Sequence, residues 1–315
     1  MIVRNGAGLR MALRVLLFEN WLPILLIVTF DILVGEIYRS SPGFRSTAFS
    51  VSSVSMLATV VGIFLVFRFD NAYQRWWEGR ILWGQLVNVS RSFGRQVTTL
   101  LNARVLQDQL NPDALSALQK KLVYRHLAYT NALRLSLRQQ EGWGELARYI
   151  SEDEMRELLK APNKPAWLLQ RQGAALSESL GPEVSQQLIL THMDTTLNQL
   201  YDIQGGCERI KNTAFPDLVK LMSRVFVWVI AMLVPAALLE PNEAIYPVEF
   251  VAVLIISLSF LIVHQLALSL MHPFDNKMND TPMSALCITI ERDLRSQLGE
   301  TELPPMPLPR DGVLM

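Results

Sequence analysis

The sequence predicts an all-α membrane protein with four transmembrane helices and a large helical region outside the bilayer. Half of its 315 residues are hydrophobic and only 18% are charged, whereas soluble domains carry roughly 25% charged residues. Four strongly apolar stretches occur in two pairs, one pair near each end of the chain. The long segment between the pairs has helical periodicity and no alternating β pattern. These observations exclude an ordinary soluble globular domain.

Each apolar stretch approaches the roughly 20 residues that a membrane-spanning helix needs. The predicted spans cover residues 21–38, 47–69, 225–239 (lengthened by 218–222) and 250–271. The first span contains Asp31, a weak functional candidate, and Glu36, which we expect to reach water near the outer end. His264 lies near the end of the fourth span. There a hydrogen-bonded packing histidine is a better interpretation than a proton relay.

The charges that flank the spans predict their orientation. Arginines precede the first span and follow the second, whereas the 240–249 loop has three acids and no base. The positive-inside rule therefore places both termini and the long middle segment in the cytoplasm, with the protein in the cell membrane. The loops at 39–46 and 240–249 then face outward. No small-residue cleavage site follows the first apolar run, so no removable signal peptide is predicted.

The pattern divides the chain into four parts. We expect an N-terminal arm with the first helix pair at 1–69, a cytoplasmic helical region at 70–215, a second helix pair at 216–272, and a C-terminal helix with a proline-rich tail at 273–315. Apolar residues recur at helical spacing within the middle region. Proline and glycine predict breaks at 111–112, 141–142, 161–162, 181–182 and 215–216.

The chain lacks the short motifs that would indicate an enzyme. It has no glycine-rich phosphate loop, no His-Glu-x-x-His and no Cys-x-x-Cys, and its four histidines are scattered. We therefore predict no catalytic residues, no metal site and no cofactor. Cys207 and Cys287 are expected to be buried free thiols. The arginines of 68–104 directly follow a span, so they indicate topology or lipid contact and not nucleic acid.

The second span combines an uncharged surface with a stripe of hydroxyls. Residues 47–67 carry no charge, and 21 helical residues reach across a hydrocarbon core of about 30 Å. One helix face carries Ser52, Ser55, Thr59, Ile63 and Phe67. Such a face fits a pore lining that narrows into a hydrophobic constriction. It fits a helix-packing face equally well, because small hydroxylic residues let membrane helices approach closely.

Three separated motifs resemble those of the bestrophin family, most closely its bacterial branch. After the second span comes Phe67-Arg68, then Asn71-Ala72-Tyr73-Gln74-Arg75-Trp76-Trp77-Glu78-Gly79-Arg80, then Leu82-Trp83-Gly84. Before the third span comes Gly205-Gly206-Cys207-Glu208-Arg209-Ile210, followed by Thr213 and Pro216. After the fourth span comes Pro273-Phe274-Asp275, then Asn279-Asp280-Thr281-Pro282-Met283. The likeness covers nearly the whole chain.

The resemblance implies a homopentameric, all-helical ion channel around one central pore. Its membrane-level neck would carry Thr59, Ile63 and Phe67, with Ser52 and Ser55 in the outer part of the pore. Thr59 departs from the family pattern, which has a bulky aliphatic residue there. The resemblance also implies a second, cytoplasmic aperture. Its residues here would be Leu188, Gln187 and Thr191.

Animal members hold Ca²⁺ with an acidic cluster after the fourth span. Here Asp275 and Asp280 are separated by Lys277, which makes a poor cage for a hard cation. We therefore expect no Ca²⁺ activation of that type.

The function expected from these observations is passive conduction of small monovalent ions, either chloride and other anions or cations such as sodium. Glu240, Glu243 and Glu249 could ring the outer mouth and concentrate cations there, or they could merely mark an outside loop. With no base in that loop, we expect a slight preference for cations. The arginines at 68, 75 and 80 would favour anions inside, unless Asp70 and Glu78 neutralise them. The expected partners are further copies of the chain, the lipid bilayer and permeant ions, and no nucleic acid. The alternatives are a secondary transporter and a membrane-anchored helical interaction module.

Overall fold

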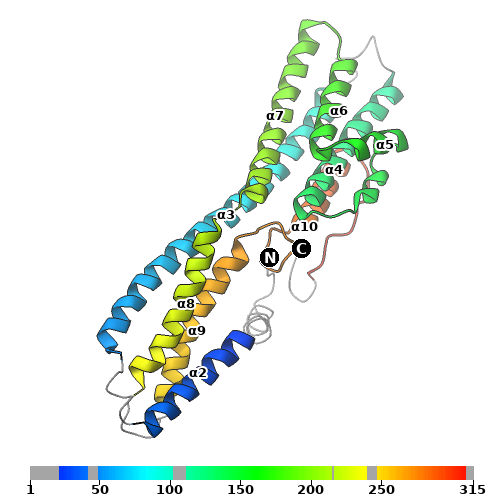
Figure 1. Cartoon of the computed structure of the whole chain (residues 1–315). Helices are drawn as coiled ribbons and strands as arrows, with labels where there is room; N and C mark the ends of the chain where they lie inside the picture. The colour runs from blue at the N-terminus through cyan, green and yellow to red at the C-terminus, as the bar shows by residue number, and fades with distance from the viewer. Residues whose placement is uncertain (1–20, 42–48, 102–110, 215, 240–246, 310–315) are drawn as a thin grey trace. The chain divides into compact units, whose positions relative to one another are not determined.

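The computed structural model describes residues 21–41, 49–101, 111–214, 216–239 and 247–309. Within these ranges the chain forms helices and no strands, as Figure 1 shows. In chain order the helices are α2 (Trp21–Ser40), α3 (Val51–Thr99), α4 (Pro112–Arg138), the 3₁₀ helix η3 (Trp143–Arg148), α5 (Glu152–Lys160), α6 (Lys164–Ser179), α7 (Val184–Asn212), α8 (Asp217–Leu238), α9 (Pro247–Leu270) and α10 (Met283–Gln297). The all-α prediction is confirmed.

The chain divides into two compact units, which we describe separately. The membrane unit comprises the described residues of Ile2–Trp76 and Ala214–His272. The polar unit comprises the described residues of Trp77–Thr213 and Pro273–Met315. The C-terminal helix α10 therefore belongs to the same unit as the middle of the chain. Within that unit, α10 packs against α4.

Among the described residues, four helices are long and apolar enough to cross a bilayer. They are Trp21–Ser40, Val51–Thr99, Asp217–Leu238 and Phe250–Leu270, and each overlaps one of the four predicted spans. α8 packs along α9, and α2 packs against both. The Tyr38 hydroxyl donates a 2.7 Å hydrogen bond to the Ala236 carbonyl, which ties α2 to α8. Glu36 lies exposed beside Arg39, as expected.

α3 is longer than the sequence pattern suggested. The prediction ended a span at residue 69, but α3 continues as one 49-residue helix to Thr99. Charges after Phe67 change the hydropathy of this helix without breaking its backbone. The Gln74 amide, for example, donates to the Asp70 carboxylate at 2.6 Å, one helical turn away. Hydropathy therefore marks where the apolar surface ends, and not where the helix ends.

The polar unit is built around α4, which packs against α6, α7, α10 and η3. Side-chain caps fix the helix starts near two predicted breaks. Asn111 and Asn163 each accept the backbone N–H three residues on, at 2.7 and 3.0 Å. Cys207 and Cys287 are buried free thiols, as predicted. Burial raises their thiol pKa values to about 12 and about 11, respectively.

The centre of α4 carries a buried histidine. His126 stacks on the Phe93 ring at a centroid distance of 4.9 Å, and its Nε2 lies 2.8 Å from the Ser90 hydroxyl. Burial lowers the pKa of His126 to about 3. The unfolded chain, with an ordinary histidine pKa near 6.5, therefore binds more protons than the folded chain between these two values. The contribution of His126 to stability is complete above pH 6.5 and falls as the pH drops.

We predict that acidification from pH 7 to pH 5 costs about 2 kcal/mol of folding stability through His126 alone. The measurement is the thermal unfolding midpoint of the purified protein at the two pH values. His126→Gln keeps a partner for Ser90 and removes the titration, so its midpoint should drop less than the parent's. His192→Gln is the matched control at an exposed site. Equal drops in the parent and His126→Gln would contradict the prediction.

Candidate ion pathway

The predicted stripe on α3 lies on the face that the chain's own membrane core leaves uncovered. Ser52, Ser55, Thr59, Ile63 and Phe67 are all exposed. Ile63 retains 54% and Phe67 66% of its accessible surface.

The opposite face of the same helix carries the buried residues Val54, Val61 and Leu65. The stripe is therefore not a packing face within one chain. It is available to a lumen, to lipid or to another copy.

The Thr59 hydroxyl is turned back onto its own helix. Thr59 Oγ1 donates a 2.9 Å hydrogen bond to the Ser55 carbonyl. This bond satisfies the hydroxyl donor locally and leaves the methyl group to face outward with Ile63. Thr59 therefore presents a less polar surface than a threonine with a free hydroxyl, and differs less from the aliphatic residue expected at this position.

Directly after Phe67, the chain buries a cation. Arg68 is only 2% exposed. Its guanidinium donates to the Ser223 hydroxyl of α8 and lies 2.9 Å from His264 Nδ1 of α9. Nε and Nη2 of Arg68 have no hydrogen-bond partner among the described residues. His264 is 3% exposed and hydrogen-bonded, as the sequence interpretation expected.

For Arg68, the pairing with Asp70 or Glu78 that the sequence left open does not occur among the described residues. Asp70 accepts a hydrogen bond from Gln74 and makes no hydrogen bond or ion pair with Arg68, because Arg68 turns inward while Asp70 is exposed. Glu78 pairs with Arg209 of α7, which lies 131 positions away. Neither of these two carboxylates therefore pairs with Arg68.

The predicted second aperture lies at the start of α7, in the polar unit. Leu188 is 67% exposed, and Val184, one turn earlier, is 77% exposed. Gln187 and Thr191 are exposed beside them. Thr191 Oγ1 donates to the Gln187 carbonyl at 2.9 Å, so it too directs its methyl group outward. The start of α7 thus presents an unpartnered apolar edge where a polar surface would be expected.

The segment after α9 is held by lysines. Lys211 Nζ lies 2.8 Å and Lys277 Nζ 3.6 Å from the two carboxylate oxygens of Asp275. Asp280 is 3% exposed, accepts from the Lys277 backbone N–H at 2.9 Å, and has its pKa raised by burial. Within the described residues no group of three or more His, Cys, Asp or Glu side chains could hold a metal.

We predict that Ca²⁺ does not gate this protein through Asp275 and Asp280. A Ca²⁺ site needs about six to eight oxygen ligands, and here two lysine ammonium groups already occupy one carboxylate. Titration of Ca²⁺ from nanomolar to millimolar in planar bilayers should leave open probability flat. A steep rise that Asp280→Ala abolishes would refute this.

Three glutamates are predicted for the outer mouth. Glu240 and Glu243 lie outside the described residues, as does the side chain of Glu249.

Two motif glycines have a structural role that spacing alone did not reveal. A Cβ at Gly79 would lie 3.0 Å from the Phe274 ring, and a Cβ at Gly206 would lie 3.0 Å from Leu82 Cδ1. Both glycines therefore let large side chains approach a helix backbone closely. Their place in the motifs reflects packing of the polar unit and not contact with an ion.

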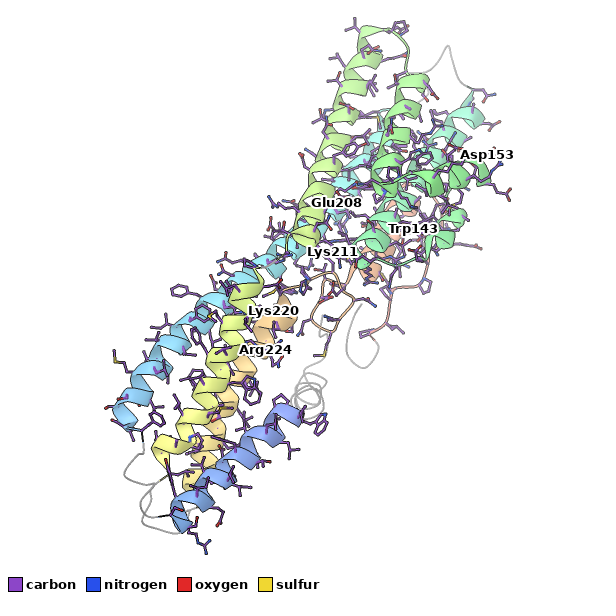
Figure 2. All side chains as sticks on the ribbon, viewed as in Figure 1. Trp143, Asp153, Glu208, Lys211, Lys220 and Arg224 are labelled. Atoms are coloured by element: carbon purple, nitrogen blue, oxygen red, sulfur yellow. The ribbon has the colours of Figure 1, made fainter. Side chains whose placement is uncertain are left out.

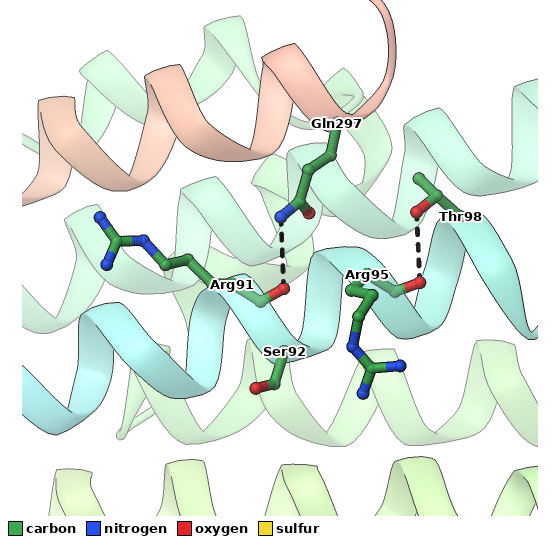
Figure 3. Close-up of a pocket in the computed structure, with 5 residues that line it drawn as sticks. All are labelled: Arg91, Ser92, Arg95, Thr98 and Gln297. Carbon is green, nitrogen blue, oxygen red and sulfur yellow. Dashed lines mark hydrogen bonds between the residues drawn. The ribbon is translucent and has the colours of Figure 1, made fainter.

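A shallow hollow of about 380 Å³ lies between α3 and α10 (Figure 3). The Gln297 amide there donates to the Arg91 carbonyl at 3.4 Å. The Arg91 guanidinium is paired with Asp293 at 2.7 Å, so its charge is already matched. The hollow lacks the exposed apolar side chains of the α3 stripe, and we do not count it among the candidate sites for ions.

Comparison with known families and proteins shows what this chain is similar to. A model of the bacterial and fungal bestrophin protein family matches residues 13–296. The voltage-dependent anion channel-forming protein YneE of Escherichia coli K12 is 32% identical over 271 residues, which are 83% of this chain and 81% of that protein. A voltage-dependent anion channel-forming protein of Mesorhizobium japonicum is 28% identical over 264 residues, covering 84% and 79%.

Solved structures agree with these sequence relatives. A bacterial bestrophin homologue from Klebsiella pneumoniae has a TM-score of 0.75 at 26% identity, covering 89% of this chain and 100% of that one. A mutant of a bestrophin homologue from the same organism has a TM-score of 0.77 at 27% identity, covering 90% and 100%.

Proposed function

The chain belongs to the bacterial and fungal bestrophin family, and from that premise we propose that it passively conducts small monovalent ions through a pore lined by α3. It is a membrane protein of a channel family and not an enzyme, since its relatives are named as channels. The single observation that carries the proposed pathway is the exposure of Ile63 and Phe67 on the uncharged part of α3.

Several chains must assemble to enclose a lumen. One α3 stripe exposes apolar and hydroxyl groups but encloses no water, whereas a closed cyclic ring of copies brings identical stripes together. The family resemblance gives five as the number of copies. The bulky exposed residues of α3, such as Met56 and Val60, are then covered by neighbouring subunits or lipid.

The proposed neck works by excluding water. Rings of Ile63 and Phe67 offer an ion no charge partner and no hydrogen bonds, so a narrow ring dewets and blocks without complete steric closure. A small rotation of α3 would move Phe67 out of the lumen and allow water to enter. Leu188, Gln187 and Thr191 form the proposed second constriction, with Leu188 as its apolar element.

Anions are the first candidates for the permeant ion. Two relatives carry the name voltage-dependent anion channel-forming, and Arg68 places an uncompensated positive charge next to Phe67. These observations outweigh the expectation of cation preference that came from the glutamates of the outer loop. The proposed setting is the cell membrane, with both termini and the polar unit in the cytoplasm.

The structure offers less support for a secondary transporter than the sequence did. Transporters of the kind considered use spans broken near the bilayer midplane. In the described residues α2 and α9 run unbroken, and α8 continues past Pro235 to Leu238. Asp31 is fully buried in α2, and neither of its carboxylate oxygens has a partner among the described residues. One buried carboxylate without a second polar group does not make a substrate site.

Purified protein in planar bilayers under a chloride salt gradient tests the proposal. Unitary currents that reverse near the chloride equilibrium potential would support an anion channel. Currents that reverse near the equilibrium potential of the cation would instead indicate a cation channel. Slow saturable uptake would identify a transporter, and silence would leave an interaction module. Native mass spectrometry in detergent should show a homopentamer. A stable dimer without pentamer would contradict the proposed ring.

A further inference from the structure

The membrane unit contains a groove that ion conduction does not use. It has a volume of about 280 Å³ and lies where α2, α8 and α9 meet. Pro23 near the start of α2, Arg224 in the first half of α8 and Leu268 near the end of α9 all line it. The groove therefore opens at the end of the spans where the polar flanking segments begin. We call it the α2–α8–α9 groove.

The groove carries an exposed positive charge. Arg224 is exposed and has no ion pair or hydrogen bond among the described residues. Lys220 is exposed one turn earlier on α8, as Figure 2 shows, and also lacks an ion pair there. Arg224 is seven residues into α8, about 10 Å along the helix axis. Its long side chain can reach back from this depth to the level of the lipid headgroups.

The wall behind Arg224 contributes a second donor, the imidazole of His264. Arginine has only hydrogen-bond donors, so the 2.9 Å contact between Arg68 Nη1 and His264 Nδ1 requires Nδ1 to accept. The imidazole is then neutral, and its proton lies on Nε2. The ring lines the groove, and no hydrogen bond of Nε2 occurs in the described residues. Nε2–H is therefore free to donate to a ligand.

The polar lining consists entirely of groups that can donate hydrogen bonds. Arg224 offers a guanidinium, His264 its Nε2–H, Gln265 an amide and Trp228 an indole N–H. No carboxylate lines the groove. Arg68 lies behind His264, within electrostatic range of Arg224, and adds a second uncompensated cation. Positive charge in an apolar setting requires a counter-charge to be stable, and the described chain supplies none here.

The other lining residues are apolar, including Pro23, Val227 and Leu261. A ligand that satisfies both parts carries an anionic head and a hydrocarbon chain. We propose that the α2–α8–α9 groove binds the phosphate headgroup of an anionic glycerophospholipid, with Arg224 and His264 on the phosphate and an acyl chain along the apolar wall. Trp21, exposed at the start of α2, is placed as an interfacial aromatic residue would be.

The test measures lipid retention by the full-length protein in detergent, so it is independent of ion conduction. Native mass spectrometry is performed with added dioleoyl phosphatidylglycerol or dioleoyl phosphatidylcholine. We expect the anionic lipid to be retained at least about tenfold more tightly, an electrostatic preference worth about 1.4 kcal/mol. Arg224→Gln should remove this preference. Arg224 is exposed and unpaired, so its replacement leaves the packed core intact.

Arg39→Gln is the matched control, because Arg39 is an exposed arginine at the opposite end of α2. It should retain the anionic lipid as the parent does. A photoactivatable phosphatidylglycerol should also crosslink to peptides of α8 and α9 in the parent. Equal retention of the two lipids, or unchanged retention in Arg224→Gln, would overturn the proposal. Displacement of the lipid by millimolar inorganic phosphate would also overturn it, because the site would then select a soluble anion.

Discussion

Replacing Phe67 with alanine should raise the unitary conductance or the open probability of the reconstituted channel several-fold. Phe67 is the bulkiest exposed residue at the inner end of the uncharged part of α3. In a closed ring of subunits, its loss would widen the lumen and remove the apolar surface that expels water. Ile63→Ala should act in the same direction, because Ile63 lies one turn away on the same face.

Single-channel recording checks this expectation. Leu25→Ala is the matched control, since Leu25 is 51% exposed in the membrane unit but lies on α2. It removes a similar apolar surface without touching the stripe. Phe67→Ala and Ile63→Ala channels with the parent's current amplitude and open probability would show that the neck is elsewhere.

The second large effect concerns the polar unit. Glu154→Ala should lower the stability of this unit by about 3–5 kcal/mol, the usual cost of leaving one partner of a buried ion pair uncompensated. Arg125 is only 2% exposed and pairs with Glu154, whose side chain is 13% exposed. Without Glu154, the guanidinium retains only two 3.4 Å contacts, with Arg171 O and Gln172 Oε1.

The thermal unfolding midpoint of the purified protein measures this loss. Glu157→Ala is the control on the same helix, because Glu157 pairs with Lys160 in an exposed setting, where a pair contributes about 0–1 kcal/mol. A double variant, Arg125→Met with Glu154→Leu, should recover most of the lost stability. Equal midpoints for Glu154→Ala and Glu157→Ala would show that burial does not strengthen this pair.

The sequence predicted those features that depend on local periodicity. The spans follow from apolar length, and the stripe from Ser52 to Phe67 follows from helical spacing. The structure adds that this stripe lies opposite the buried residues Val61 and Leu65. Periodicity can identify a face, but only packing shows whether the chain covers that face itself.

Features that depend on distant contacts were not predictable from the sequence. Arg68 meets Ser223 and His264 across 155 and 196 positions, whereas sequence reasoning looked for partners on its own helix. Glu78 likewise pairs with Arg209 of another helix. The described parts of α8 and α9 around Ser223 and His264 carry no acidic residue that would indicate a buried cation between them. The α2–α8–α9 groove, whose lining has no carboxylate, depends on the same kind of distant contacts.

The most direct test of the central claim is chemical modification of a cysteine placed in the stripe. The native thiols Cys207 and Cys287 are buried, so the parent should be insensitive to a charged, water-soluble methanethiosulfonate reagent. In an Ile63→Cys channel the same reagent should react in the conducting state and change the current irreversibly. Val61→Cys, at a residue only 2% exposed on the opposite face of α3, should not respond. An active Ile63→Cys channel whose current is unaffected by the reagent would contradict an ion pathway along this face of α3.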